Sequence, residues 1–395
     1  MRIGIDARFS DIAGIARYAQ NLISNLEIGD DINEYVVFLL YKNLNWYRPQ
    51  KNNFKAVEAN FPYYSFSEQL LFPFKIWQAK LDLMHFLNFN VPLLYFGRYI
   101  ITIHDLIYED HSTFGMTTRS KSYYLFKKVI AKLMIRWSTF RAEKIIVPSL
   151  TTKAKLIDKL HISSDKIIVT YEGIDVNWIN NVKLKEEKDA DFLASYGIKT
   201  PYLLYVSTMY PYKNHKLLID AFRDLLSQNS TTKLQLVLVT KEDSFTQKIR
   251  EYIKNQNLEA KVIIPVKEED NGFLNDQKLQ IIFRNAQLYV TPSLEEGFGL
   301  TILEAWASKV PVLVSDIPVL KEIGNDAVEF VNSKNRGQMT DKIKELLINQ
   351  ELRNRLVVKG LERLANFSWV RMANQTKEIY QSHPDTPIHR GMDKL

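Results

Sequence analysis

The stretch that decides the fold is residues 291–318, TPSLEEGFGLTILEAWASKVPVLVSDIP. It is typical of a strand, a glycine loop, a helix and a second strand in succession. Gly297 and Gly299 carry no Cβ, so the backbone of this loop can approach a ligand closely. The helix expected from about Leu300 directs free N–H groups and the positive end of its dipole at whatever lies above the loop. We therefore predict an anion-binding loop here, and a phosphate suits it.

Two carboxylates flank that loop. Glu296 and Glu304 are separated by seven residues, with Glu304 one turn into the expected helix. A carboxylate repels a phosphate but accepts hydrogen bonds well from the paired hydroxyls of a sugar. Such a spacing is common in ordinary helices, and it is the Gly-Phe-Gly between the two residues and the strand before them that favour a functional pair. Together these features predict a site for a nucleoside diphosphate attached to a sugar.

Length and composition set the domain count and the compartment. A chain of 395 residues exceeds what one core usually holds, so two domains of about 150–200 residues are expected. There is no cysteine, so neither a disulfide nor a thiolate metal site is available, which fits a reducing compartment. Met1 leads directly into the strand-like Arg2–Asp6, and no window reaches the ~18 apolar residues of a membrane-spanning helix. We expect a cytoplasmic protein, soluble or peripheral on the inner face of the plasma membrane.

The positive charge is concentrated in residues 117–144. This segment holds eight basic residues and the single acid Glu143, a net charge of +7 that equals the net charge of the chain. At helical spacing one face is basic, with Lys121, Lys128, Lys132 and Arg136. One interpretation is an ordinary surface helix; the other is contact with an anionic membrane surface, at about 1 kcal/mol for each basic residue. Nucleic acid is not expected as a partner, because no recognition motif accompanies the charge.

Short β-branched runs alternate with helical stretches in both halves, which predicts an α/β protein with parallel sheets. The strands expected in the first half are Arg2–Asp6, Tyr35–Leu40, Leu83–Phe86, Tyr99–Ile103, Lys144–Pro148 and Ile167–Tyr171. Those expected in the second half are Tyr202–Ser207, Gln235–Thr240, Val262–Pro265, Leu288–Thr291, Val312–Ser315 and Val328–Phe330. Two such domains in tandem place the carboxyl ends of their strands across a cleft. The informative residues Gly14, His104, Lys213 and Glu296 all follow expected strands.

Several of these residues also have structural interpretations. His104 could be a hydrogen-bonded core histidine and Lys213 a surface lysine, but their places directly after strands favour function. Asp105 suits an N-cap as well as a catalytic role. Arg17 and Tyr18 are expected to pack the first helix, and His85 and His111 are expected to be structural.

In its motifs the sequence resembles the retaining glycosyltransferases of family 4, which have the two-Rossmann-domain architecture called GT-B. The resemblance covers nearly the whole chain. The motifs that carry it are Ile5–Arg8, Gly14–Leu22, Thr102–Leu106, Tyr171–Asp175, Tyr205–Ser207, Tyr212–His215, the Glu296/Glu304 pair and Phe367–Trp369. Among family members the chain is most similar in character to bacterial mannosyltransferases of cell-surface polysaccharide.

The resemblance implies a domain plan. It predicts an N-terminal Rossmann-like acceptor domain over 1–178, a linker over 179–199 and a C-terminal domain over 200–366 that binds the nucleotide-sugar donor. A helix over 367–382 is expected to cross back onto the N-terminal domain. The final residues, 383–395, are expected to be a disordered tail.

The same resemblance implies roles for individual residues. Glu304 would accept hydrogen bonds from both ribose hydroxyls, and Glu296 would hold hydroxyls of the donor sugar. Lys213 would neutralise the departing phosphate, and His104 would contact the sugar from the first domain, so His104, Lys213 and Glu296 are the expected catalytic residues. The remaining donor contacts are assigned to Gly14 and to the backbone of Gly297, Phe298, Gly299 and Leu300. No metal or other cofactor is expected, since Lys213 and a helix N-terminus supply the positive charge.

The chain departs from the family pattern at two notable positions. Tyr212 stands where many members have an arginine before the lysine, and Ser207 where many have glycine or arginine. One cation fewer at the diphosphate bears on the rate or on the geometry of the leaving group. The changes at Thr301 and Lys309, where proline and glycine are common, are expected to be tolerated.

The function predicted is transfer of a hexose, with retention, to a hydroxyl of a glycan or lipid-linked glycan in O-antigen or capsule synthesis. GDP-mannose is the preferred donor, with dTDP-rhamnose or a UDP-hexose as the alternative. A catalytically silent nucleotide-sugar-binding assembly protein is the other alternative, and an epimerase or phosphorylase of the same fold is a further one. A Rossmann-type oxidoreductase is disfavoured, because no Gly-x-Gly-x-x-Gly follows the first strand.

Overall fold

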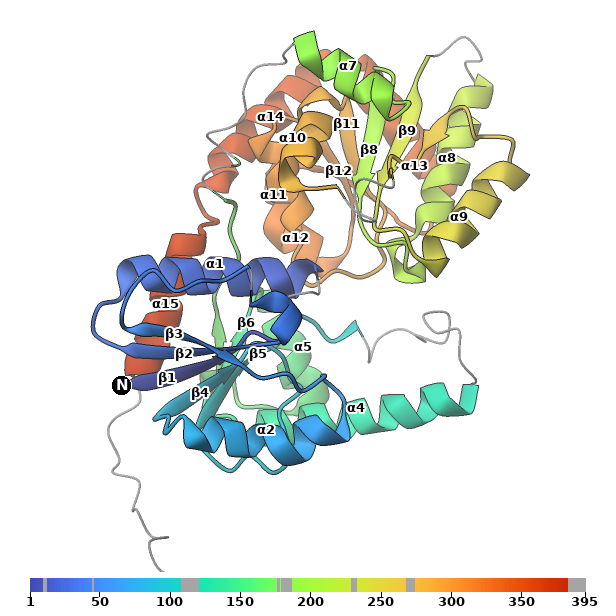
Figure 1. Cartoon of the computed structure of the whole chain (residues 1–395). Coiled ribbons are helices and arrows are strands. Elements are labelled where there is room, and N and C mark those ends of the chain that lie inside the picture. The colour runs from blue at the N-terminus through green and yellow to red at the C-terminus, as the bar shows by residue number, and fades with distance from the viewer. Residues whose placement is uncertain are drawn as a thin grey trace, which may run out of the picture.

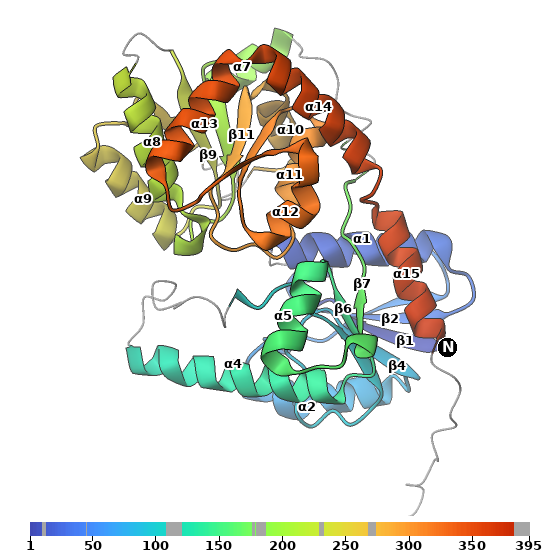
Figure 2. The same cartoon turned by 180° about the vertical axis from the view of Figure 1, so that it is seen from behind.

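The structure of the protein, a computed structural model, describes residues 1–9, 13–44, 46–107, 121–175, 178, 187–228, 233–267 and 274–382. The expected tail over 383–395, most of the expected linker and His111 lie outside the described residues. Figures 1 and 2 show two α/β domains stacked one above the other, each built on its own sheet.

The first domain is a parallel sheet with the strand order β3-β2-β1-β4-β5-β6-β7. Its strands are β1 (Arg2–Asp6), β2 (Glu34–Leu39), β3 (Phe54–Glu58), β4 (Leu83–Phe86), β5 (Tyr99–Thr102), β6 (Ile145–Val147) and β7 (Ile167–Val169). Its helices are α1 (Ala13–Gly29), α2 (Phe66–Gln78), α4 (Lys121–Arg141) and α5 (Leu150–Leu160), with single 3-10 turns at Tyr41–Asn43 and Ser164–Lys166. The central strands are apolar on both faces because helices cover both sides of the sheet.

The second domain repeats this plan with the order β10-β9-β8-β11-β12-β13, again parallel. Its strands are β8 (Tyr202–Val206), β9 (Gln235–Val239), β10 (Val262–Ile263), β11 (Leu288–Thr291), β12 (Val312–Ser315) and β13 (Glu329–Val331). Its helices are α7 (Glu187–Ser195), α8 (His215–Gln228), α9 (Ser244–Asn255), α10 (Asp276–Asn285), α11 (Leu300–Ala307), α12 (Pro318–Gly324), α13 (Arg336–Ile348) and α14 (Gln350–Leu364), with 3-10 turns at Pro211–Lys213 and Asn325–Ala327. In both sheets the order of the strands reverses beside the first strand of the domain, between β1 and β4 and between β8 and β11. In this doubly wound arrangement ligands bind at the carboxyl ends of the strands.

The last helix, α15 (Trp369–Gln381), belongs to the core of the first domain. Its apolar side chains Trp369, Met372 and Tyr380 pack in the same cluster as β1 and α1, and α15 runs beside α1 in Figures 1 and 2. The Tyr380 hydroxyl lies 2.7 Å from Nδ1 of the buried His85. The predicted α/β architecture, with two Rossmann-like domains and a terminal helix that crosses back, is therefore confirmed.

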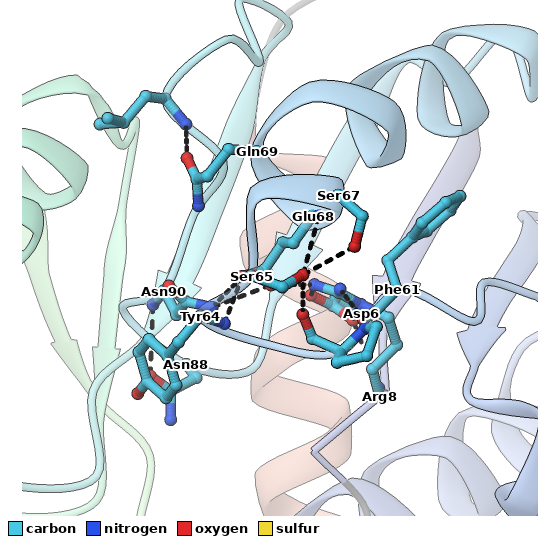
Figure 3. A network of polar contacts seen from close by, with 12 residues as sticks. Asp6, Arg8, Phe61, Tyr64, Ser65, Ser67, Glu68, Gln69, Asn88 and Asn90 are labelled. Carbon is cyan, nitrogen blue, oxygen red and sulfur yellow. Dashed lines mark hydrogen bonds and ion pairs between the residues drawn. The ribbon is translucent and has the colours of Figure 1, made fainter.

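A buried polar network anchors the end of β1 (Figure 3). Arg8 donates hydrogen bonds of 2.8 Å to both oxygens of Asp6 and to Glu68 on α2. Asn90, in the loop after β4, donates to both oxygens of Glu68 at 2.8 and 2.9 Å. Arg8 and Glu68 are buried completely, and a buried charge is tolerated only with its partners in place. The network therefore fixes α2 and the loop after β4 at the carboxyl edge of the sheet.

Two features differ from the expectation. Strand β3 was not predicted, because its sequence FKAVE mixes charged and apolar residues at a sheet edge. Part of the expected linker over 179–199 is helix α7, whose Leu193 is in the core of the second domain and whose Asp189 accepts hydrogen bonds from Arg284 and Asn285. None of the described helices is long and apolar enough to cross a membrane.

Candidate active site between the two domains

Lys213 and Glu296 form the central ion pair of the second domain. Lys213 lies in the turn after β8 and Glu296 in the loop after β11, and the lysine Nζ is 2.6 Å from both carboxylate oxygens. Both side chains are 13% exposed. The Ser293 hydroxyl donates to Glu296 at 2.7 Å, and the buried Tyr205 lies 2.8 Å from that hydroxyl and 3.1 Å from the carbonyl of Lys213. Ser293 and Tyr205 thus hold the ion pair in place from the protein interior, and a small part of each charged side chain remains exposed to solvent.

The glycine loop brings the two domains into contact at Gly297. A Cβ at this position would lie 2.9 Å from the carbonyl oxygen of His104 and 3.3 Å from the Cβ of Asp105. A side chain there would force the two loops apart. Gly299 has φ 107° and caps helix α11, a backbone conformation that glycine adopts readily. The glycines are therefore needed for a close approach between loops as well as for the turn.

The other residues of this loop differ in their surroundings. The side chain of Phe298 is buried in the core of the second domain beside Tyr171 and Phe367. Only the backbone of Phe298 is in a position to face a ligand. Leu300 is partly buried and packs against the cores of both domains. The first turn of α11 thus begins at the boundary between the domains.

His104 lies on the first-domain side of this contact. Its Nδ1 is 3.4 Å from a carboxylate oxygen of Glu172, and its Nε2 is 3.2 Å from the carbonyl of Leu87. Tyr18 packs edge-on against the ring at 4.8 Å between centroids. Both ring nitrogens therefore have acceptors in the protein, which fixes the orientation of the imidazole beside Gly297.

Asp105 lies next to His104, and the sequence left open whether it is an N-cap or a catalytic residue. Its Oδ1 accepts a hydrogen bond of 3.0 Å from the N–H of Ile107, as in an N-cap. Burial raises the pKa of Asp105, and the charges of Lys213 and Glu296 also act on it. Those two residues belong to the other domain, so Asp105 has a capping bond and also lies at the interdomain site. Its place directly after His104, in the loop that follows β5, was the only signal in the sequence.

Glu304 pairs with Arg17 across the interface. Glu304 is almost completely buried on α11, and one of its oxygens accepts from Arg17 of α1. Arg17 also donates to Asp276 at 2.7 Å. The second oxygen of Glu304, Oε2, is buried without a hydrogen-bond partner among the described residues. Arg17 was expected merely to pack the first helix; instead it joins the two domains.

The space beside Glu304 is small. It measures about 50 Å³ and is lined by residues of both domains, including Arg17, Asp175, Trp178 and Asp276. A water occupies ~30 Å³ of liquid, and ligand pockets are usually ~300–1,000 Å³. A ribose fits beside Glu304 only after Arg17 and its surroundings have moved. The unpartnered oxygen is consistent with a place for a hydroxyl donor.

Further contacts close the interface between the domains. Lys155 of α5 donates to Glu295 at 2.7 Å. Glu322 of α12 accepts from the N–H groups of Leu150 and Thr151 at the start of α5, at 2.7 and 2.8 Å. These bonds place a second-domain carboxylate at the N-terminus of a first-domain helix, where the dipole favours it. The described arrangement is thus a closed one.

The structure brings together His104, Lys213, Glu296 and Gly297, and it places Glu304 with Arg17. Gly14 stands apart: it is exposed in the first turn of α1, and apart from its chain neighbours and its own helix backbone no atom of the described residues lies within 4 Å of the position of a Cβ there. Tyr212, in the place of an arginine, has its ring centroid 5.3 Å from the Nζ of Lys213 and stacks on Tyr210. Among the described residues there is no group of three or more His, Asp or Glu side chains arranged for a metal.

A larger cavity opens beside Asp105 within the first domain. It has a volume of about 400 Å³. Its lining residues are Phe89, Asp105, Leu106, Lys128, Ala131, Lys132, Ile135 and Lys159. Neither Lys128 nor Lys132 forms an ion pair with any residue that the structure describes. Asp105 therefore lies between this cavity and the Lys213–Glu296 pair.

Comparison with known proteins follows the two domains. The family "Glycosyltransferase Family 4" matches residues 12–178, and "Glycosyl transferases group 1" matches residues 190–363. The O-antigen chain mannosyltransferase RfbU of Salmonella typhimurium is 26% identical over 263 residues, 65% of this chain and 62% of the relative. The match thus spans less than two thirds of that relative's length. The O-antigen chain mannosyltransferase B of Escherichia coli is 23% identical over 385 residues, 94% of this chain and 96% of the relative.

A solved structure shows the same fold. The crystal structure of Anabaena Alr3699/HepE in complex with UDP and glucose has a TM-score of 0.72 at 16% identity, with 97% of this chain and 100% of that chain covered. At such an identity the likeness concerns the fold alone. The two family matches together span both domains and meet close to the start of α7. The chain belongs to the family 4 glycosyltransferases, with the GT-B arrangement of two Rossmann-like domains.

Proposed function

We propose that the protein transfers a hexose from a nucleotide-sugar donor to a hydroxyl of a glycan acceptor, in the synthesis of a cell-surface polysaccharide. The observation that carries this proposal is the placement of Lys213 and Glu296 opposite His104 and Asp105, with Gly297 as the contact between the two loops. One cation, one carboxylate and a glycine loop at a helix start suit the phosphates and hydroxyls of such a donor.

In the proposed reaction Lys213 leaves Glu296 and binds the donor diphosphate, while Glu296 accepts hydrogen bonds from hydroxyls of the sugar. The N–H groups at the start of α11 and the backbone of Gly297–Leu300 would lie under the phosphates, whereas Gly14, which stands apart in the described arrangement, could reach them only after the domains move. Glu304 accepts from the ribose hydroxyls through the oxygen that now has no partner. His104 holds the sugar from the opposite side. Positive charge that is already in place where phosphate charge develops favours departure.

Retention at the anomeric carbon is proposed to proceed on one face of the sugar. The bond from the anomeric carbon to the phosphate oxygen breaks, and the acceptor oxygen forms its bond on the same face. The hydroxyl proton passes to the departing phosphate, so the products are a glycoside and a nucleoside diphosphate. No covalent sugar–enzyme intermediate is invoked, and no metal is required, because Lys213 and α11 carry the charge stabilisation.

The test is transfer by the full chain and by Glu296→Ala, compared with Glu259→Ala, an exposed glutamate of the same domain. We expect Glu296→Ala to lose transfer while donor binding weakens less, and Glu259→Ala to behave as the original protein. Unchanged transfer by Glu296→Ala overturns the assignment. Incubation with donor alone separates transfer from epimerisation, because an epimerase produces a new sugar nucleotide without an acceptor.

For the donor we propose GDP-mannose. The support is the two relatives whose names state that they are O-antigen mannosyltransferases; the name of the similar structure, by contrast, states UDP and glucose. A thermal-shift screen over GDP-mannose, dTDP-rhamnose and UDP-hexoses decides, because a ligand at about 100 times its Kd stabilises a protein by ~2.7 kcal/mol. If a UDP-sugar or dTDP-sugar raises the melting temperature most, that sugar replaces GDP-mannose as the proposed donor.

For the acceptor we propose a glycan linked to a lipid through phosphate. The support is the cavity of about 400 Å³ next to Asp105 and the lysines Lys128 and Lys132 in its wall. The same helix supplies the basic segment 117–144, so the protein is proposed to act on the cytoplasmic face of a membrane, with anionic lipid near α4. Ammonium groups bind phosphate as point charges, which suits a headgroup that a neutral sugar acceptor lacks.

Tyr212 favours a second candidate, a protein that binds a nucleotide sugar without transferring it. Its ring occupies the place of a family arginine and stacks on Tyr210, so the diphosphate has one cation fewer. Calorimetric binding of donor with no transfer to any lipid-linked glycan supports this candidate. A higher turnover in Tyr212→Arg than in the original protein supports the alternative, that the protein is an active glycosyltransferase.

A further inference from the structure

Helix α2 exposes a row of large apolar side chains. Phe66, Leu70, Phe74 and Trp77 recur at helical spacing, and Phe66 is 89% and Trp77 77% exposed. The opposite side of the helix, with Phe72 and Ile76, is buried in the first domain. A surface helix normally presents polar residues to solvent. This helix is therefore apolar on both sides, and its packing in the domain explains only one of them.

The exposed row continues beyond α2. The loop before β5 carries Leu93, Leu94 and Phe96, all exposed. The Leu93 N–H donates to Gln69 of α2 at 2.8 Å. Arg141, at the end of α4, donates to the carbonyls of Tyr95 and Phe96 at 3.0 and 3.3 Å. We refer to Phe66, Leu70, Phe74, Trp77, Leu93, Leu94 and Phe96 as the apolar face.

The apolar face is held rigidly. Ser65 caps the first turn of α2 by accepting from the N–H of Glu68 at 3.1 Å, and Glu68 is fixed by Arg8 and Asn90 (Figure 3). Both Figures 1 and 2 place α2 and α4 at the end of the first domain that is remote from the second domain. A contiguous exposed apolar patch on a well-ordered element marks an interaction surface.

The charge beside the apolar face identifies what covers it. Lys75 lies on α2, and Lys132, Arg136 and Arg141 lie on the described part of α4. The acid on α2, Glu68, is buried and paired with Arg8. We propose that this face docks on an anionic lipid bilayer, with its aromatic and leucine side chains among the headgroups and its basic side chains on lipid phosphates. Aromatic rings combined with lysine and arginine are typical of interfacial helices.

Charge disfavours a second copy of this chain as the occupant. A symmetric pair would set the basic residues of one copy against those of the other, and like charges face to face oppose association. A bilayer with anionic headgroups satisfies both the apolar and the basic parts. Lys132 also belongs to the wall of the cavity beside Asp105, so docking would present that cavity to a lipid-linked acceptor. This last step rests on the proposed function; docking itself does not.

The test is co-sedimentation of the full chain with vesicles of phosphatidylcholine alone and of equal parts phosphatidylcholine and phosphatidylglycerol. The variant is Phe74→Ser/Trp77→Ser, and the matched control is Ile348→Ser/Val358→Ser, two exposed apolar residues of the second domain. We expect the variant to bind anionic vesicles at least about tenfold more weakly, because two interfacial side chains are lost. The control is expected to bind as the original protein does.

Salt and fluorescence separate the two components of docking. Raising the salt weakens the contribution of the basic residues but not that of the apolar side chains. The variant is therefore expected to lose the salt-resistant part of binding. The vesicle-induced blue shift of tryptophan emission is expected to persist in the control and to disappear in Trp77→Phe, which keeps an aromatic ring at this position.

Equal vesicle binding by the variant and the control overturns the proposal. Dimers in gel filtration that disappear in the variant also overturn it, and assign the face to a second copy. The donor-induced thermal shift, measured on every variant, is expected to stay unchanged, so loss of docking is distinguishable from failure of the proposed function.

Discussion

The Nζ of Lys213 lies 2.6 Å from each carboxylate oxygen of Glu296, and the two residues come from different loops of the second domain. In the closed arrangement each neutralises the other. Under the proposed function, a nucleotide sugar would offer a phosphate to Lys213 and hydroxyls to Glu296, so the pair could separate without leaving an uncompensated charge in a partly buried site. The ion pair would then keep both groups in position before the donor binds.

Lys213→Met is expected to lower the rate of transfer by about 100- to 1,000-fold, the range for removal of one charge-stabilising group. Because the lysine is proposed to act on charge that develops as the phosphate departs, kcat should fall more than KM rises. Steady-state kinetics with saturating acceptor measures both. Lys216→Ala, at the second position of α8 and with its Nζ 4.9 Å from the ring centroid of Tyr252, is the control. A pure KM effect in Lys213→Met would assign the lysine to binding alone.

Glu304→Gln is expected to weaken donor binding about tenfold or more, because one buried acceptor proposed to bind the ribose hydroxyls becomes a donor group, at about 1–3 kcal/mol. Titration calorimetry with the nucleoside diphosphate isolates this step from the sugar. Asp276→Asn changes the other partner of Arg17 and serves as the control. Equal affinity in both variants would remove Glu304 from the ribose site.

Lys128→Glu/Lys132→Glu is expected to raise the KM for a phosphate-bearing acceptor about tenfold and to leave the KM for donor unchanged. The reason is that both lysines line the cavity beside Asp105, which shares no lining residue with the space beside Glu304, and that charge reversal would place acids near the proposed acceptor phosphate. Kinetics with varied acceptor gives the result. An acceptor without phosphate should be used equally by both forms, and a parallel loss with that acceptor contradicts the assignment.

Treatment with EDTA is expected to leave the transfer rate unchanged, because we propose that Lys213 and the N–H groups at the start of α11 supply the positive charge at the diphosphate. The measurement compares chelated protein with and without added Mg²⁺ or Mn²⁺. A metal-dependent enzyme assayed in the same buffers controls for incomplete chelation. Activity that is lost on chelation and restored by one metal would show that the two protein groups are insufficient.

Much of the fold could be predicted because buried parallel strands read as continuous apolar runs between helices. Strand β11 was located to the residue for this reason, whereas β3, a mixed polar strand at a sheet edge, was not. Helix α7 was not predicted because its segment is rich in charged residues and resembles a linker. Its Asp189 is paired with residues about 95 positions further along the chain, which local sequence does not reveal.

In the candidate site, too, some features could be predicted from the sequence and others could not. Glu296 and Lys213 were recognisable because their motifs are local, with glycines and strands at fixed distances. The bond from Arg17 to Glu304 joins residues 287 positions apart and depends on how the two domains meet. The environment of Asp105 has the same origin, since charges of the other domain raise and lower its pKa. Local sequence therefore indicated candidate residues, whose roles stay predictions, and the arrangement of the domains determined which residues surround them.

The buried His85 is expected to make the protein sensitive to acid. Its Nδ1 lies 2.7 Å from the Tyr380 hydroxyl and its Nε2 2.8 Å from the Thr102 hydroxyl, so it joins α15 to the first sheet. Burial lowers the pKa of His85 to about 3, and His104 adds to the shift. In the unfolded chain the pKa is about 6.5. The unfolded state therefore takes up a proton first as the pH falls, and stability present above about pH 6.5 is lost toward pH 3.

The free energy of unfolding, measured by urea titration at pH 7, 5.5 and 4.5, should decrease in that order. His85→Gln keeps a polar side chain but does not titrate, so its decrease should be shallower than that of the original protein. It should not vanish, because burial also lowers the pKa of His215 to about 3. The exposed His161 has no such burial, and His161→Gln should show the full slope. Identical slopes in all three proteins would mean that acid acts elsewhere than at the junction between α15 and the first domain.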